Sequence, residues 1–199
     1  MKHLITAIVE INTRKSKVVL DYEEELALYK GELRRFNIQE GDVMPDKVYE
    51  EIMTEILPKR ARERCLNLLA QRSMTEWEVR KKLRDGYYPE CIIGNVIALL
   101  QKHHLLDDAD YADSYIRMKK SAKSKRQIEQ DLARKGVSQD TIRNTLSGCG
   151  VDEEHNIHVL MQKKKIDPAC STQEELQKFA AFLFRKGYDY DLIRKVVFR

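Results

Sequence analysis

Glycine and proline are both scarce in this chain of 199 residues, with eight and four copies respectively. All-β proteins need many turns, and disordered linkers are rich in these residues, so the scarcity argues against both classes. The composition, 42% hydrophobic and 34% charged, is instead typical of a helix-rich protein that folds in water. We therefore expect a mainly helical fold.

The chain also lacks a long apolar run. The N-terminal stretch MKHLITAIVEIN is short and contains Glu10, which does not fit a secretory signal, and no run approaches the about 18 apolar residues of a membrane span. Cys65, Cys91, Cys149 and Cys170 lie far apart and form no C-x-x-C pair, so we expect reduced thiols. These absences predict a cytoplasmic protein that is not bound to a membrane.

Motifs of common enzyme and nucleotide sites are missing as well. The sequence has no G-x-G-x-x-G, no G-x-x-x-x-G-K-[ST], no H-E-x-x-H and no G-x-S-x-G. The nearest approach to a metal site is the set Cys149, His155, His158 and Cys170, whose spacing fits no usual zinc finger. We predict no enzyme activity, no cofactor and no metal site, and keep a zinc-dependent protein as an alternative.

The N-terminal part carries the strand-like patterns. Residues 4–11 and 17–20 are β-branched runs separated by the polar NTRKS, which predicts a β-hairpin. Residues 26–29 fit either a third strand or the start of a helix. Asp46–Leu57 has the pattern of an amphipathic helix, which we expect Pro58 to end. The rest of the chain has helical patterns only.

One helical pattern occurs three times. In the first copy, RSMTEWEVRKKLRDGYYPECI, Thr75 and Glu78 form a capping box at a helix start, and Gly86 is placed to end that helix. The glycine recurs at Gly136, 50 residues after Gly86, and at Gly187, 51 residues after Gly136. Each of the three glycines is followed six and ten residues later by an aliphatic residue. These aliphatic pairs are Ile92 and Val96, Ile142 and Leu146, and Ile193 and Val197. The agreement predicts a repeat.

A further helical pattern precedes each copy, so the repeating unit has three helices. We predict a mainly α protein whose tandem three-helix repeats form an elongated, curved array, with a small N-terminal β-hairpin element. The predicted parts are residues 1–57, 58–105, 106–150 and 151–199. Trp77 is expected to pack inside the first repeat, so that its truncation to alanine costs about 3 to 5 kcal/mol.

Charge is unevenly distributed along the chain, whose formal net charge is +4. Residues 1–57 hold eight Lys or Arg against twelve Asp or Glu, so the remainder carries a balance of +8. A run of cations is usually a solvated helix face, but repeated basic clusters favour a polyanion or an acidic protein groove as the partner. The clusters comprise Arg117, Lys119, Lys120, Lys123, Lys125 and Arg126, then Lys163, Lys164 and Lys165, and finally Arg194 and Lys195.

Three segments, taken in order, resemble a known family. Arg72–Leu83, followed by Gly86, corresponds to R-x-x-S-x-x-E-L-x-x-K-L and a later K-G; Asp107–Ala112 matches D-D-x-x-[FY]-A; and Ile128–Val137 reads IEQDLARKGV. Together they resemble the RecX regulatory proteins, over about residues 60–147. The third repeat resembles that family loosely and the N-terminal hairpin hardly at all.

The resemblance implies a bacterial cytoplasmic regulator of the RecA recombinase that acts as a monomer in DNA repair, recombination and the SOS response, without catalytic activity. Proteins similar to this one bind in the groove of the RecA filament on single-stranded DNA and suppress ATP hydrolysis and strand exchange. The implied partners are therefore the RecA filament and single-stranded DNA, contacted directly or through the filament. We take the basic clusters as candidate RecA- or DNA-binding residues, and keep a free, helix-turn-helix-like DNA-binding protein as an alternative.

Overall fold

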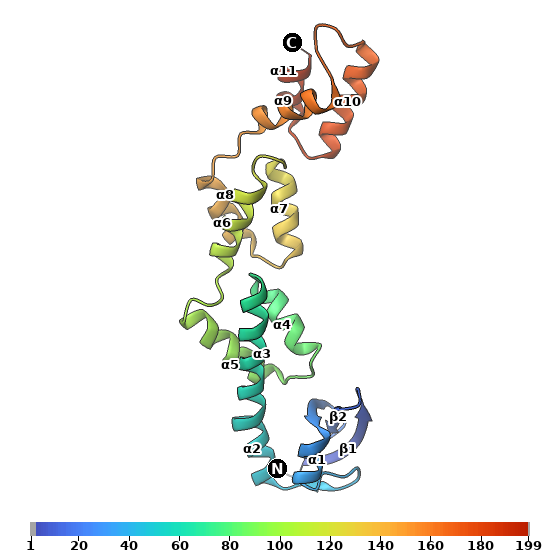
Figure 1. Ribbon diagram of the computed structural model, residues 1–199, viewed down its shortest axis with the longest axis vertical. Coiled ribbons are helices and arrows are strands. Elements are labelled where there is room, and N and C mark those ends of the chain that lie inside the picture. The colour runs from blue at the N-terminus through green and yellow to red at the C-terminus, as the bar shows by residue number, and fades with distance from the viewer. Residues whose placement is uncertain (1–2, 199) are drawn as a thin grey trace. The chain divides into compact units, whose positions relative to one another are not determined.

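The computed structural model describes residues 3–198, and the chain divides into two compact units between Leu106 and Asp107. Figure 1 shows the strands, in blue, within the first unit, together with helices α1 to α5. The second unit contains helices α6 to α11. The mainly helical fold with a small N-terminal strand element is thus confirmed.

The N-terminal element is a four-stranded antiparallel sheet in the order β3-β2-β1-β4. Its strands are β1 (His3–Glu10), β2 (Lys15–Leu20), β3 (Glu24–Tyr29) and β4 (Val43–Met44). β1 and β2 form the predicted hairpin, in whose turn the Asn12 side chain accepts hydrogen bonds from the amides of Arg14 and Lys15 at 2.9 and 3.0 Å. Residues 26–29, which the pattern left open between strand and helix, belong to β3.

The helix at residue 46 runs past Pro58, so the prediction that this proline ends the helix is wrong. After the short α1 (Lys30–Arg35), helix α2 (Asp46–Glu51) continues through a π-helical turn, η1 (Ile52–Ile56), into α3 (Leu57–Gln71). Pro58 is the second residue of α3 and follows the π turn after Leu57. The wider π turn shifts the backbone hydrogen-bond register just before Pro58, and this shift accommodates a residue that has no amide donor within a continuing helix.

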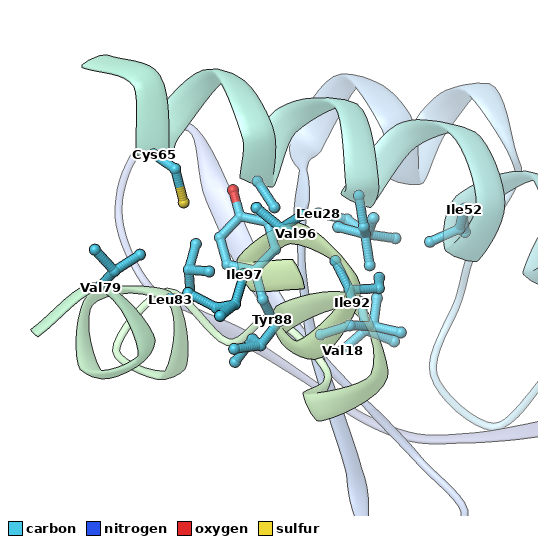
Figure 2. Close-up of a cluster of buried hydrophobic side chains, with 14 of the residues drawn as sticks. Val18, Leu28, Ile52, Cys65, Val79, Leu83, Tyr88, Ile92, Val96 and Ile97 are labelled. Carbon is cyan, nitrogen blue, oxygen red and sulfur yellow. The ribbon is translucent and has the colours of Figure 1, made fainter. Parts of the chain in front are cut away.

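The sheet and the first repeat share one hydrophobic core. Helices α4 (Glu76–Arg84) and α5 (Glu90–Lys102) complete the first repeat with α3. In Figure 2, Val18 and Leu28 of the strands lie in the same cluster as side chains of all three helices. The labelled helical and loop members of this cluster are Ile52, Cys65, Val79, Leu83, Tyr88, Ile92, Val96 and Ile97.

The second unit contains two more three-helix repeats, each with its own core. α6 (Asp108–Lys119), α7 (Lys125–Arg134) and α8 (Gln139–Gly148) bury one cluster, centred on Ile116, Ile128 and Leu132. α9 (Glu153–Lys164), α10 (Gln173–Arg185) and α11 (Tyr190–Val197) bury another, around Phe179 and Leu183. The tandem repeat is confirmed, whereas the division at residues 57, 105 and 150 stays a prediction.

The glycine register differs from the prediction in the first repeat. Gly136 and Gly187 each have the left-handed φ of +81° that suits a helix C-terminus. In the first repeat the left-handed residue is Tyr87, with φ +57°, and Gly86 precedes it. Counted from the left-handed residue, the matching buried pairs are Ile93 and Ile97, Ile142 and Leu146, and Ile193 and Val197. The expected pairing of Ile92 and Val96 with the later repeats is therefore wrong by one residue.

Trp77 does not pack inside the first repeat, contrary to the prediction. Its side chain is 45% exposed, and the ammonium of Lys81 lies 5.3 Å from the centre of its ring. The buried residues of α4 are Val79 and Leu83, which share one helix face. Trp77 precedes Val79 by two positions, about 200° around the helix, and so points away from the core.

Candidate functional site

The basic cluster of the second repeat spans the junction of α6 and α7. Arg117 and Lys119 end α6, Lys120 and Lys123 lie in the connecting loop, and Lys125 begins α7, followed by Arg126. The first turn of α7 contains no acidic residue. Cations at a helix N-terminus oppose the helix dipole, so the placement of Lys125 and Arg126 does not serve helix stability.

Two members of this cluster are ion-paired. Arg117 pairs with Asp113 one turn earlier on α6, and Lys123 pairs with Asp131 of α7. Asp131 also accepts a hydrogen bond of 3.0 Å from the Tyr115 hydroxyl. The hydrogen bond to Asp131 raises the pKa of Lys123. Burial opposes ionisation of Asp131, but its hydrogen bonds with Lys123 and Tyr115 outweigh burial and lower its pKa. Lys123 thus holds the loop to α7.

Four members of the cluster are free of carboxylate partners within the described residues: Lys119, Lys120, Lys125 and Arg126. Three of them are exposed, and Lys119 is half-buried. Unpaired cations this close along the chain raise the local positive potential and favour an anionic partner. We call these four residues the junction cations.

Contacts with the third repeat hold the segment that carries the junction cations. The buried Ser124 caps α7 by accepting a hydrogen bond of 3.2 Å from the Gln127 amide, and its hydroxyl donates to the Lys186 carbonyl at 2.6 Å. The buried Asn156 amide donates to the carbonyl of Lys120 at 2.7 Å. The Lys125 amide donates to a Glu153 carboxylate oxygen at 2.9 Å. The junction cations are therefore presented on a fixed backbone.

The predicted cations of the third repeat fall into two separate groups. Lys163 and Lys164 end α9 and Lys165 follows it, whereas the ammonium of Lys195 on α11 pairs with Glu154 at 2.9 Å. Glu154 lies in the first turn of α9, so the length of that helix, roughly 15 Å, separates the two groups. The sequence pattern could not show this separation because it depends on how α11 packs against α9.

A groove on the third repeat contains one of these groups. It has a volume of about 550 Å³ and is lined by Lys163, Lys164, Ile166, Glu175, Lys178, Phe179, Phe182 and Arg185. Sequence reasoning did not single out Lys178 or Phe182 as site residues. Their signal is the spacing of Lys178, Phe182 and Arg185 along α10, four and then three residues apart, which places all three on one face.

The zinc alternative gains no support from the structure. In the part of the chain that is described, no three His, Cys, Asp or Glu side chains are grouped so that they could hold a metal ion. His155 and His158 are exposed, and the Cys149 thiol lies 3.3 Å from an Asp113 carboxylate oxygen.

Between residues 3 and 198, no helix is both long and apolar enough to cross a membrane.

Comparison with known proteins assigns the family. Models of the first, second and third three-helix domains of RecX match residues 61–100, 107–146 and 152–197 in that order. A Regulatory protein RecX of Clostridium botulinum strain Alaska E43 is 32% identical over 167 residues, which cover 80% of this chain and 79% of that relative. The chain belongs to the RecX family.

Other RecX proteins extend the match to nearly the full length. A Regulatory protein RecX of Finegoldia magna is 29% identical over 201 residues, covering 97% of this chain and 98% of the relative. A crystal structure of RecX from Lactobacillus salivarius has a TM-score of 0.63 and 25% identity, and covers 71% of this chain and 95% of that one. Another crystal structure of a regulatory protein RecX, at 22% identity, shares the fold with a TM-score of 0.64 and covers 98% of both chains.

Proposed function

We propose that this RecX family protein binds the RecA filament on single-stranded DNA and lowers the ATP hydrolysis and strand exchange of RecA. The observation that carries the proposal is the set of four junction cations, which have no carboxylate partner within residues 3–198 and sit on a backbone fixed by the third repeat. The name Regulatory protein of the relatives supports a regulator rather than an enzyme.

The physical basis is a surface suited to a polyanion. A nucleoprotein filament carries phosphates and acidic side chains along a groove, and cations that neutralise them release counterions and so gain free energy. Junction cations without internal partners lose no ion pair when they bind. In this proposal Arg117, Lys163, Lys164, Lys165, Arg194 and Lys195 extend the contact, while Lys123 supports it through Asp131.

In this proposal, the protein acts as a monomer in the cytoplasm and needs no cofactor or metal to regulate RecA. Regulation by binding requires only complementary charge and shape, and the resemblance to RecX regulators supports this mode. The alternative function, a free DNA-binding protein, predicts tight binding to naked duplex DNA. The affinity of that binding falls steeply as the salt concentration rises.

Neutralising the junction cations tests the proposal. The variant Lys119→Ala, Lys120→Ala, Lys125→Ala and Arg126→Ala is expected to bind preformed RecA filaments at least about 10-fold more weakly, measured by co-sedimentation. We omit Lys123 because its loss removes the ion pair with Asp131 that holds the loop to α7.

The matched control removes four exposed cations from the first unit: Lys59→Ala, Arg62→Ala, Lys82→Ala and Lys102→Ala. It changes the net charge by the same amount and is expected to bind filaments like the wild type. Wild-type binding by the junction variant, or equal loss in both variants, contradicts the assigned surface.

A further inference from the structure

Phe182 combines an aromatic face with cations in the groove of the third repeat. Its half-buried ring lines the groove formed by the end of α9 and by α10, the orange helices in Figure 1. The ammonium groups of Lys164 and Lys186 lie 4.6 and 5.2 Å from the centre of this ring. Phe179 lies beside it, with ring centres 6.0 Å apart and planes 24° from parallel. The ring is therefore held in place at the wall of an open, positively charged groove.

The charge of the groove is mostly uncompensated. Lys163, Lys164, Lys178 and Arg185 line it against the single carboxylate of Glu175. Glu175 is occupied locally, since it accepts hydrogen bonds from the amide of Thr172 at 2.8 Å and from its hydroxyl at 3.0 Å in the capping box of α10. Of the cations, Lys178 pairs with Glu174 at 2.5 Å. Lys163, Lys164 and Arg185 have no carboxylate partner in the part of the chain described.

We propose that this groove binds single-stranded DNA by stacking one base on Phe182, while Lys163, Lys164 and Arg185 neutralise the adjacent phosphates. A groove of about 550 Å³ lies within the range of about 300 to 1,000 Å³ that holds small-molecule groups. An incoming base takes the place of one of the two lysine ammonium groups near the Phe182 ring. The displaced lysine stays within reach of the phosphate that flanks the stacked base. This assignment adds a stacking site that the basic clusters alone do not supply.

The chemistry favours a single strand over the other anionic partners. Bases in a duplex are stacked on one another and present no free face, so a duplex can use the cations but not Phe182. An acidic protein segment can also pair with the cations, but it gives no role to an aromatic ring set among them. The combination of a π-face and flanking cations is the pattern that binds unpaired nucleotides without base specificity.

The inference rests on the proposed function, because it assigns a DNA contact to a regulator that binds the RecA filament. Base stacking on Phe182 is nevertheless measured without RecA, so the proposed function and the groove assignment can be contradicted separately. A wild-type protein that leaves RecA activity unchanged yet stacks a base on Phe182 contradicts the proposed function and supports the groove. The converse result, inhibition of RecA without any contribution of stacking, overturns the groove alone.

The experiment compares two fluorescein-labelled 15-nucleotide probes, oligo(dT) and an abasic strand with the same phosphates, by fluorescence anisotropy at low salt. Wild-type protein is expected to bind oligo(dT) about 5- to 100-fold more tightly than the abasic strand. Phe182→Leu keeps an apolar side chain for the core but removes the aromatic face, and is expected to abolish this preference. Phe182→Tyr is expected to retain it.

The matched control is Phe36→Leu, since Phe36 is also half-buried and has a guanidinium, that of Arg35, 4.7 Å from its ring centre. This variant is expected to keep the wild-type preference. The pair Lys163→Ala and Lys164→Ala is expected to weaken binding to both probes and to make the salt slope for the single strand less steep by about 1.4.

Two results overturn the inference: equal binding of both probes by the wild type, or an unchanged preference in Phe182→Leu. Loss of binding to RecA in the absence of DNA, with unchanged DNA binding in the groove variants, also overturns it and assigns the groove to a protein partner.

Discussion

At the scale of single residues, solvent exposure separates stabilising side chains from those available for binding. Thr75 and Ser124 are polar yet fully buried, because each satisfies helix amides as an N-cap. Trp77, the one tryptophan of the chain, is 45% exposed, and the ammonium of Lys81 lies 5.3 Å from the centre of its ring. Residue type alone therefore misplaces Trp77, since its size favours burial while the helix phase turns it outward.

Truncation of Trp77 is predicted to have little effect on stability. Trp77→Ala is expected to lower the free energy of unfolding by about 1 kcal/mol, because its side chain is 45% exposed and lies off the buried face of α4. Leu83→Ala, on the buried face of the same helix, is expected to cost about 2 to 5 kcal/mol. Urea unfolding followed by circular dichroism measures both, and a Trp77→Ala cost as large as that of Leu83→Ala contradicts the exposed placement.

At the scale of elements, local signals predicted helix starts well and some of the ends poorly. The capping box at Thr75 forms as the sequence indicates, since it involves residues only three positions apart, and the structure has a second capping box at Thr172. The prediction that Pro58 ends the helix was wrong because a π turn precedes this proline, and no pattern in the sequence indicates that turn. The register error around Gly86 was also invisible, because Ile92, Val96 and the true matches are all buried in α5.

Gly86 illustrates why a glycine need not mark a left-handed residue. A Cβ at this position would lie only 3.0 Å from the ring carbon Cε2 of Tyr88, so close packing of the ring requires glycine here. The left-handed conformation passes to Tyr87, whose ring lies 5.3 Å from the Lys17 ammonium. Among the described residues, only the first repeat packs against a sheet, and this packing distinguishes it from the other two repeats.

Gly187 combines both reasons for glycine and yields a prediction. Its φ is +81°, and a Cβ would lie 3.1 Å from the Cβ of Arg126 and 3.2 Å from the hydroxyl of Ser124. Gly187→Ala is therefore expected to destabilise the second unit by about 1 to 3 kcal/mol, through backbone strain and crowding at the repeat junction. Thermal or urea unfolding measures the change.

The matched control is Gly148→Ala in α8, where an added Cβ meets nothing within 4 Å and φ is not left-handed. Its effect is expected to stay within about 0.5 kcal/mol of zero. Equal effects of the two substitutions contradict the close junction between the second and third repeats.

At the scale of the whole molecule, the sequence predicted the repeated fold but only part of the candidate site. Cations close in sequence, such as Lys119 and Lys120, stay close in space because a single helix end carries them. Which cations remain unpaired, and which meet Phe182, depends on contacts between elements that composition and periodicity do not encode. The candidate site therefore became specific only with the tertiary structure.

The decisive measurement is the single-stranded-DNA-dependent ATPase rate of a cognate RecA, titrated with this protein after filaments have formed. We expect inhibition at substoichiometric amounts, with a markedly weaker effect from the variant that lacks the four junction cations and none from an unrelated protein of similar net charge. An unchanged ATPase rate, even with the protein in excess over RecA, contradicts the proposed function.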